Sequence, residues 1–469
     1  MDREQARQQW WMWAAHQTQD DATRTRMVEA ALRVMEAGGS AADAAAAGTA
    51  ALNAPPPAAP PGPPTGARAL VRSATEDRLL LGVGIIGVLA ILGVVAVVGI
   101  SSLRAKPVAV HKPAVVVKQI DTPETRAIRA FIPEAKRFVE AHRGLKYNAD
   151  VPVTFLTDAD FKKRIASSPA DQKGVDMATK EWRALSLIPP GLDLGKELTD
   201  LATNGIAGYY DSSTKQLVVR GVAPTTDNRV TLVHELTHAL QDQHFALSRL
   251  SRVKTDEESV AFRSLVEGDA VRIQEEYIAS LPKAEQDTYN SAQQAGQSAS
   301  GGAPDALLEE FGFPYSSGTD FVKTLVDARG QAYLDAAFVN PPTTTAQIIH
   351  PERYINIEAA QPVAAPAADG KVFDDGTMGE LGIRAVLYQA VTQKLISLND
   401  FLFATDGWAG DSYTAWSTAT GACVRDSIAS RSLTDAEGLW LGLTKVAGLR
   451  KGWTVTTSRG LIVNFTACG

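Results

Sequence analysis

The sequence predicts an α+β fold. A small mixed sheet with an edge hairpin precedes two long helices, a mainly helical C-terminal subdomain follows them, and one transmembrane helix stands before the whole. Three observations predict this order: an unbroken apolar segment at residues 79–100, short β-branched segments between residues 151 and 222, and two helical segments within residues 226–280. With 469 residues and 45% hydrophobic content, the chain can form the core of one large domain or two ordinary ones.

The apolar segment at residues 79–100 predicts a single membrane span. Its 22 residues contain no charge and no proline, and at about 1.5 Å per residue they cross the ~30 Å hydrocarbon core. Nearly eighty residues precede it, which favours a retained anchor over a cleaved signal peptide. Basic residues lie on both sides, so charge does not orient the span. We expect the large C-terminal part outside the cytoplasmic side of the cell membrane, where single-pass anchors usually carry their soluble domain.

The span divides the chain into segments of different composition. Proline-rich residues after position 54 predict an extended spacer that leads to the membrane. The predicted parts are a polar helical segment at 1–53, a linker at 54–78, the span at 79–100, a stalk at 101–120, a core at 121–300 and the helical subdomain at 301–469.

Charge and cysteine content exclude some functions. The net charge of −7 is modest, and no cluster of lysine and arginine alternates with aromatic residues, so we expect no nucleic-acid partner. Cys423 and Cys468 are the only cysteines and lie too far apart for a CxxC or zinc-knuckle pattern. They form either one disulfide, which requires an oxidising compartment, or two unrelated buried thiols. Nothing in the sequence indicates the oligomeric state.

The core begins with short elements in a definite order. Alternating β-branched residues predict a strand, and the turn-forming sequence DSSTK between two apolar runs predicts a hairpin. The predicted elements are a strand at 151–156, a helix from residue 158, a helix around 177–187, and the two hairpin strands at 206–210 and 216–222.

A helix with a metal-ligand pattern follows the hairpin. Thr226 or Asp227 can cap a helix of sequence RVTLVHELTHALQDQHFAL, which has apolar residues at helical spacing. His234 and His238 are one turn apart on one face, as two imidazoles on a single Zn²⁺ at ~2.1 Å must be. Glu235 stands beside them, where a carboxylate can take a proton from a water on the metal.

A catalytic zinc ion needs a third protein ligand, and the sequence offers two candidates. Glu267 lies in a second predicted helix from about Asp256, within SLVEGDA, where apolar neighbours direct it toward the core. His244 follows at the spacing HExxHxxGxxH, but Gln241 occupies the position of the glycine. If the helix continues, His244 points about 120° away from His238. Glu267 is therefore the preferred third ligand.

The segments VTLVHELTHALQDQH and SLVEGDA, about fifty residues together, resemble the gluzincins and a group of uncharacterised bacterial proteins with the sequence HELTHALQDQH. The resemblance implies a zincin-like domain with a thermolysin-like core, Zn²⁺ on His234, His238 and Glu267, and hydrolysis of peptide bonds by water. Glu235 would be the general base. The hairpin at 206–222 would supply an edge strand that pairs with an extended peptide substrate, which suits an endopeptidase.

The donor that stabilises the oxyanion is left open by the sequence. The candidates are Tyr209, Tyr210, His350, Tyr354 and Arg384. We prefer His350, within QIIHPERY, as a catalytic residue, although a capping or core role fits it equally well. Asp269 is a candidate for orienting a zinc-bound imidazole, but a helix places it about 200° away from Glu267.

Helices are predicted in the C-terminal subdomain at 307–311, 321–326 and 381–390. The alternative to a membrane-anchored metallopeptidase is a catalytically idle domain of the same fold that binds a protein partner. The presence of Glu235 favours the enzyme, because a catalytically inactive domain has no chemical need for a general base.

Overall fold

The computed structural model describes residues 121–167, 172–299, 303–458 and 460–469. The predicted N-terminal segment, linker, transmembrane helix and stalk, together residues 1–120, lie outside this range. None of the helices in the described ranges combines the length and apolar content that a membrane crossing requires.

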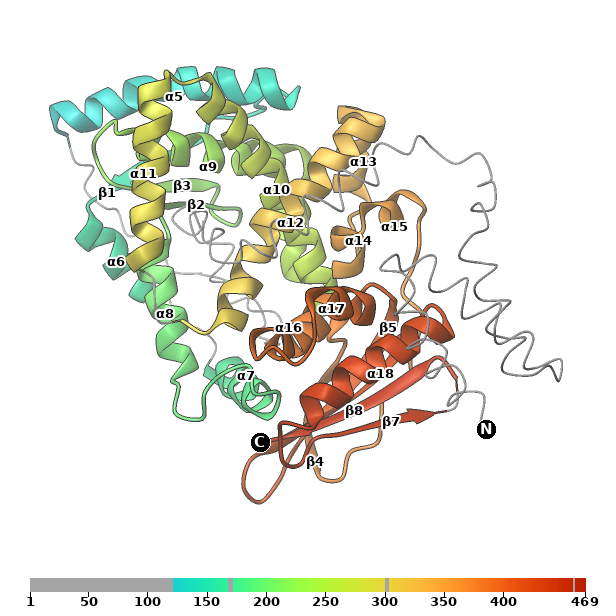
Figure 1. The fold of residues 1–469 in the computed structure, drawn as a ribbon. Coiled ribbons are helices and arrows are strands. Elements are labelled where there is room, and N and C mark those ends of the chain that lie inside the picture. The colour runs from blue at the N-terminus through green and yellow to red at the C-terminus, as the bar shows by residue number, and fades with distance from the viewer. Residues whose placement is uncertain (1–120, 168–171, 300–302, 459) are drawn as a thin grey trace. The chain divides into compact units, whose positions relative to one another are not determined.

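A three-stranded sheet opens the core (Figure 1). Strand β1 runs parallel to β3, and β2 runs antiparallel to β3, so that β2 lies at one edge in the order β1-β3-β2. Asp211 closes the hairpin by accepting hydrogen bonds from the backbone of Ser213 and Thr214 at 2.8 and 3.2 Å. The predicted hairpin is therefore present. The elements are α5 (Pro123–Arg143), β1 (Val153–Leu156), α6 (Asp158–Ala166), α7 (Gln172–Ala184), α8 (Leu194–Gly205), β2 (Gly208–Asp211) and β3 (Gln216–Arg220).

Two long helices follow the sheet. Helix α9 (Thr226–Phe245) begins at Thr225, whose side chain accepts from the backbone N–H of Asn228, so the cap is one residue earlier than predicted. Helix α9 packs on β2 and β3 and against α10 (Asp256–Ser280). Every residue at 230–242 of α9 is buried. The helix therefore lies at the centre of the core. Its polar residues can contact other elements on several sides.

Helix α12 (Asp305–Arg329) crosses α10 at close range. It is one continuous helix through Pro314, where the sequence predicts separate helices at 307–311 and 321–326. A Cβ atom on Gly268 would collide with the carbonyl of Gly318, and one on Gly318 would collide with the carbonyl of Ser264. Helix α12 shares a hydrophobic cluster with α10, so the two helices pack together across the boundary predicted at residue 300.

The C-terminal part contains the helices predicted there and a sheet that was not predicted. Five strands form an antiparallel sheet in the order β4-β5-β6-β8-β7. Strands β5 and β6 are buried along nearly their whole length, so their sequences lack the alternation that marks a half-exposed strand. The elements are α11 (Lys283–Ala299), α13 (Gln331–Val339), α14 (Thr345–Ile349), α15 (Pro351–Ile355), β4 (Lys371–Gly376), α16 (Gly379–Thr392), α17 (Leu398–Thr405), β5 (Trp408–Ser417), β6 (Ala422–Ser430), α18 (Leu433–Ala447), β7 (Thr454–Ser458) and β8 (Ile462–Cys468).

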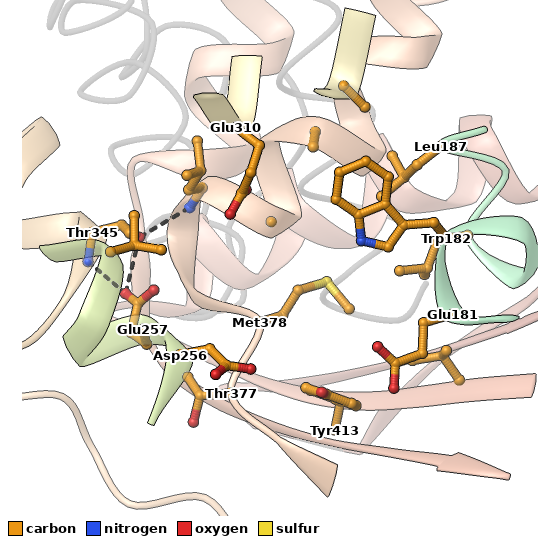
Figure 2. A pocket seen from close by; sticks show the side chains of 17 residues that line it. Glu181, Trp182, Leu187, Asp256, Glu257, Glu310, Thr345, Thr377, Met378 and Tyr413 are labelled. Carbon is orange, nitrogen blue, oxygen red and sulfur yellow. Dashed lines mark hydrogen bonds between the residues drawn. The ribbon is translucent and has the colours of Figure 1, made fainter. Parts of the chain in front are cut away.

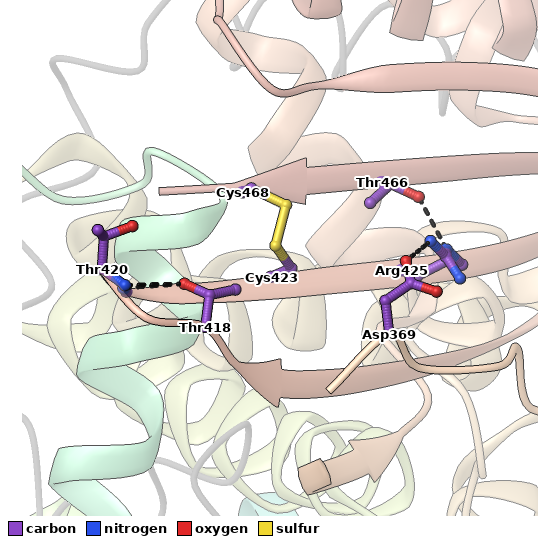
Figure 3. The surroundings of a disulfide bond; sticks show 8 residues. Asp369, Thr418, Thr420, Cys423, Arg425, Thr466 and Cys468 are labelled. Atoms are coloured by element: carbon purple, nitrogen blue, oxygen red, sulfur yellow. Dashed lines mark hydrogen bonds and ion pairs between the residues drawn. A yellow bond between two sulfur atoms is a disulfide. The ribbon is translucent and has the colours of Figure 1, made fainter. Parts of the chain in front are cut away.

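The two cysteines form a disulfide in this sheet. Cys423 on β6 stands directly opposite Cys468 on β8, and their sulfur atoms are bonded (Figure 3). On the same strand pair, Arg425 of β6 donates to Thr466 of β8 at 3.0 Å, and it also donates to Asp369, just before β4, at 2.6 Å. These links fasten the last strand of the chain to the centre of the sheet, and they resolve the alternative that the sequence leaves open.

Candidate metal centre

Helices α9 and α10 bring three predicted ligands together. The Nε2 atoms of His234 and His238 are 3.1 Å apart, and Oε2 of Glu267 lies 3.3 and 3.2 Å from them. Ligand atoms at about 2.0–2.1 Å from a tetrahedral ion stand roughly 3.3 Å from one another. The three atoms therefore have the spacing of three ligands of one zinc-sized ion, and they lie among the groups with metal-binding geometry in the described residues.

The outer nitrogen of each imidazole is held by a glutamine. Nδ1 of His238 lies 3.0 Å from Oε1 of Gln241, and Nδ1 of His234 lies 2.9 Å from Oε1 of Gln274. The Gln241 amide nitrogen donates to Asp269 and to the carbonyl of Val266, so its oxygen must face the imidazole. Each Nδ1 then carries the proton, and each Nε2 lone pair points to the centre of the group.

Three acceptors that meet at one point need a positive charge between them. In the metal-free protein, a proton on His238 supplies this charge. Burial alone would lower the pKa of His238, but the charge of Glu267 outweighs burial and raises this pKa to about 9. Burial likewise opposes ionisation of Glu267, yet the imidazoles lower its pKa to about 2. Neither carboxylate oxygen of Glu267 has a hydrogen bond of good geometry in the described residues. The donor set fits a divalent metal.

Glu235 lies beside the candidate ligands on α9, but its side chain packs against strand β2. Its side chain is 0% exposed and lies against Gly208 of β2, where a Cβ atom would contact Thr231 and Glu235. Burial raises its pKa to about 8, and the charge of Glu267 adds to the rise, whereas His238 and the Tyr210 backbone oppose it. A carboxylate with this pKa can both accept and release a proton near neutral pH.

Tyr315 also lies at the site, and no sequence pattern predicted it there. Tyr315 lies on α12, and its ring stacks on His234 with centroids 6.3 Å apart. The side chain is 3% exposed. Burial raises its pKa well above the usual value, and the charges of Glu267 and Glu235 add to the rise. The phenol therefore stays protonated. No motif or spacing links residue 315 to the two ligand helices.

Asp269 supports the site indirectly. It accepts from Gln241 at 3.0 Å, from Arg143 at 2.6 Å and from Arg272 at 2.9 Å. The sequence suggests that Asp269 could orient an imidazole, and the structure shows that it does so through Gln241 rather than by contact. Burial of Asp269 opposes its ionisation, but Arg143 and Arg272 keep its pKa below the usual value. A buried charge network thus fixes the orientation of His238.

His244 and His350 do not join the group. Helix α9 continues through Gln241, and His244 is exposed, with Nε2 2.7 Å from the carbonyl of Lys146. His350 lies 2.9 Å from Glu380, in a separate cluster with Arg353 and Arg384. This corrects the choice of His350 as a catalytic residue. That cluster also has metal-like spacing, but its two guanidinium groups already neutralise the carboxylates.

Three of the other candidate donors, Tyr354, Tyr210 and Arg384, bond groups outside the metal group. The Tyr354 hydroxyl donates to the carbonyl of Asn340 at 2.7 Å, and the Tyr210 hydroxyl donates to Asp242 at 2.8 Å. Arg384 bonds Glu380 and Asp406. Tyr209 packs in the same hydrophobic cluster as Tyr315. Among the described residues, Tyr315 is therefore the phenol that stacks directly on a candidate ligand.

Comparisons with known proteins place the chain in no family. No protein-family model and no curated protein matches it. Among solved structures, it is similar to a protein from Chloroflexus aurantiacus described as a candidate hydrolase with a novel fold, with 16% identity and a TM-score of 0.34 over 51% of this chain and 91% of that one. Likeness of this degree assigns neither a fold nor an activity.

Proposed function

We propose that the protein is a zinc metallopeptidase that hydrolyses peptide bonds with water. The observation that carries the proposal is the convergence of three acceptor atoms from His234, His238 and Glu267, with an unliganded carboxylate, Glu235, directly beside them. Two imidazoles and one carboxylate are the donor set of catalytic zinc sites, which keep one position for water. Zinc in such a site supplies the Lewis acidity that makes water nucleophilic near neutral pH.

The residues of the chain have distinct roles in the proposed reaction. Glu235 takes a proton from the attacking water and returns it to the leaving amine. Tyr315 donates a hydrogen bond to the carbonyl oxygen as that oxygen gains charge. Gln241 and Gln274 hold the two imidazoles in one tautomer and orientation.

The edge strand β2 is the proposed docking element for the peptide. It pairs with β3 on one side, and no strand of the described ranges pairs with its other side. Gly208 of β2 packs against the side chain of Glu235. A peptide added to this edge in extended form would lie across the general base, with its main chain hydrogen-bonded to β2.

Two features support the proposed cellular setting. The disulfide between Cys423 and Cys468 suits an oxidising compartment, which agrees with a domain outside the cytoplasm. The apolar segment at residues 79–100 would anchor this domain to the cell membrane as a single-pass protein. The proposed substrates are therefore peptides or proteins within reach of the membrane surface.

A second candidate is a metal-stabilised scaffold that binds a protein partner without catalysis. It is favoured by the burial of the group: His234, Glu235 and Glu267 are 0% exposed, and His238 is 1% exposed. A catalytic site must admit substrate, so the peptidase requires a movement that uncovers these residues. The scaffold requires none.

Metal analysis and cleavage assays on the full chain decide between these functions. We expect one zinc ion per chain in the wild type and in His244→Ala, but none in Glu267→Ala. Glu235→Gln should retain the zinc and lose cleavage of a peptide library. Zinc without cleavage in the wild type would favour the scaffold, and a wild type that binds no zinc would exclude both metal-dependent roles.

A further inference from the structure

The last residue of helix α5 reaches the groups that support the metal centre. Arg143 ends α5, and Gly144 after it has a φ of +75°, so the helix stops there. Helix α5 lies beside α10 (Figure 1). The Arg143 side chain is 0% exposed, and its Nε atom donates to Asp269 of α10 at 2.6 Å. The two residues are 126 positions apart in the chain, so this bond forms only when α5 is docked on the core.

A single oxygen atom of Asp269 bonds both of its neighbours on this path. Its Oδ2 atom accepts from Arg143 and also, at 3.0 Å, from the amide nitrogen of Gln241. The Gln241 oxygen faces Nδ1 of His238 at 3.0 Å. Because an amide nitrogen donates and an amide oxygen accepts, the carboxylate fixes which end of Gln241 faces the imidazole. Consecutive hydrogen bonds therefore join α5 to a candidate zinc ligand.

The Arg143 guanidinium is held from several other sides. It lies over the rings of Phe245 on α9 and Phe338 on α13, 5.6 and 5.5 Å from their centroids. Its second bond, at 2.6 Å, goes to Asp335 of α13, whose side chain is 33% exposed. Two aromatic faces and two carboxylates thus give the guanidinium one fixed position, from which it fixes Asp269.

We propose that Arg143 is a positioning residue and that docking of α5 sets the zinc affinity of the metal group. With α5 docked, Arg143 and Asp269 hold Gln241, and Gln241 holds His238 with its Nε2 atom toward the ion. With the end of α5 displaced, Gln241 can turn, and His238 loses this orientation. The inference rests on the proposed zinc site and adds its regulation: whatever displaces α5 lowers the affinity for zinc.

The coupling has to act in both directions. If the docked helix strengthens zinc binding, zinc must strengthen docking of the helix by the same free energy. Hydrogen exchange of the wild-type full chain, with and without zinc, measures this directly. We expect zinc to slow exchange in the last turn of α5, residues 140–143, and to leave α18 in the C-terminal part unchanged. Equal exchange of the last turn in both states would overturn the coupling.

The zinc affinity of Arg143 variants tests the starting point of the path. Arg143→Met removes every donor, and we expect the zinc dissociation constant to rise about 10–100-fold. Arg143→Lys, whose ammonium group can still approach Asp269, should show a smaller rise, and it replaces the methionine variant if that one does not fold. Asp335→Asn removes the other ion pair of the same guanidinium and should bind zinc as the wild type does. Wild-type affinity in both Arg143 variants would overturn the proposal.

A double variant tests whether the effect passes through Gln241. If it does, Arg143→Met combined with Gln241→Leu should bind zinc no more weakly than Gln241→Leu alone. A merely structural role of Arg143 would instead add its own loss to that of Gln241→Leu. Additive losses would therefore overturn the path.

A buried acid at the start of α10 provides the control for general loss of stability. Glu257 accepts hydrogen bonds from the backbone and side chain of Thr345 (Figure 2). It belongs to an acidic cavity lined by four carboxylates, Glu181, Asp256, Glu257 and Glu310. Glu257→Ala leaves the buried donors of Thr345 without this acceptor, so it should lower the Tm but keep the zinc affinity. If it weakened zinc binding as much as Arg143→Met, the positioning role would be overturned.

These outcomes are distinguishable from failure of the proposed peptidase. Zinc binding that depends on Arg143, in a chain that cleaves no peptide, supports the coupling and overturns the peptidase. Zinc binding and cleavage that are both indifferent to Arg143 overturn the coupling and leave the peptidase intact. A wild type that binds no zinc overturns both.

Discussion

Gly268 and Gly318 place the backbones of α10 and α12 in direct contact, one residue after the candidate ligand Glu267 and one turn after Tyr315. A Cβ atom on either glycine would collide with a carbonyl of the facing helix. The close crossing is what allows the Tyr315 ring to reach His234 from a separate helix. The glycine pair thus positions a phenol that no local sequence pattern connects to the metal group.

Replacement of Gly318 by alanine should separate the two helices. Overpacking of a close contact costs typically about 1–3 kcal/mol, so we expect a lower Tm for Gly318→Ala. Gly191→Ala is the matched control, because a Cβ atom at Gly191 meets nothing within 4 Å. Thermal unfolding followed by circular dichroism measures both. Equal Tm values for the two variants would mean that the crossing is not tight in solution.

Tyr315→Phe should keep the fold and the metal but slow the reaction. The phenol is the proposed donor to the carbonyl oxygen, and loss of one such donor costs about 10²–10³ in kcat. Steady-state cleavage together with zinc content measures the effect. Tyr354→Phe, which removes a hydroxyl bonded to the Asn340 carbonyl, should leave kcat unchanged. A Tyr315→Phe enzyme with wild-type kcat would remove Tyr315 from the mechanism.

Gln241→Leu should weaken metal binding without removing a ligand. The substitution deletes the acceptor of the His238 Nδ1 proton and the link to Asp269. Loss of such supporting groups typically costs about 10–100-fold in metal affinity. Competition with a zinc chelator measures the dissociation constant. Gln243→Leu breaks hydrogen bonds to the loop at Asn148 and Ala149 and should bind zinc normally; comparable losses in both variants would indicate a general effect on α9.

Ionisation of Glu380 should make the free energy of unfolding depend on pH in the acidic range. Burial opposes its ionisation, but His350, Arg384 and Arg353 lower its pKa from 4.5 to about 2. Because the folded-state pKa is the lower one, the ionised group stabilises the fold above about pH 4.5, and this contribution is lost as pH falls toward 2. The linkage amounts to about 3 kcal/mol.

Urea unfolding at pH 3 and pH 7 tests this dependence. The wild type should lose stability between the two values, and Glu380→Gln should lose less, since the variant has no carboxylate to protonate. At pH 7 the variant should be less stable than wild type, because it leaves buried positive groups unpaired. Glu352→Gln, on the surface, should follow the wild-type curve. An unchanged pH dependence in Glu380→Gln would contradict the assignment.

The disulfide should contribute substantially to the C-terminal sheet. Cys423 and Cys468 close a loop with a sequence separation of 45, for which chain entropy gives about 4 kcal/mol. We expect the double variant Cys423→Ser, Cys468→Ser to unfold at lower urea concentration than the wild type, and reducing agent to shift the wild type alone. A wild type insensitive to reduction and equal in stability to the double variant would contradict this contribution.

Features that depend on neighbours along the chain were predictable from the sequence. Helical periodicity places His234 and His238 on one face, the DSSTK turn defines the hairpin, and apolar neighbours direct Glu267 inward. The same periodicity shows that His244 points elsewhere. These predictions succeed because backbone hydrogen bonding and side-chain repeat are local properties.

Contacts between groups far apart in the chain became visible in the folded structure alone. In the folded structure the Tyr315 ring stacks on His234, and Asp269 accepts a hydrogen bond from Gln241. His350 lies beside Glu380, in a separate cluster. The fold also forms the five-stranded sheet and the acidic cavity, whose walls come from elements spread over much of the described chain. No spacing rule connects such residues, because their proximity results from helix crossings and strand pairings that the whole core stabilises together.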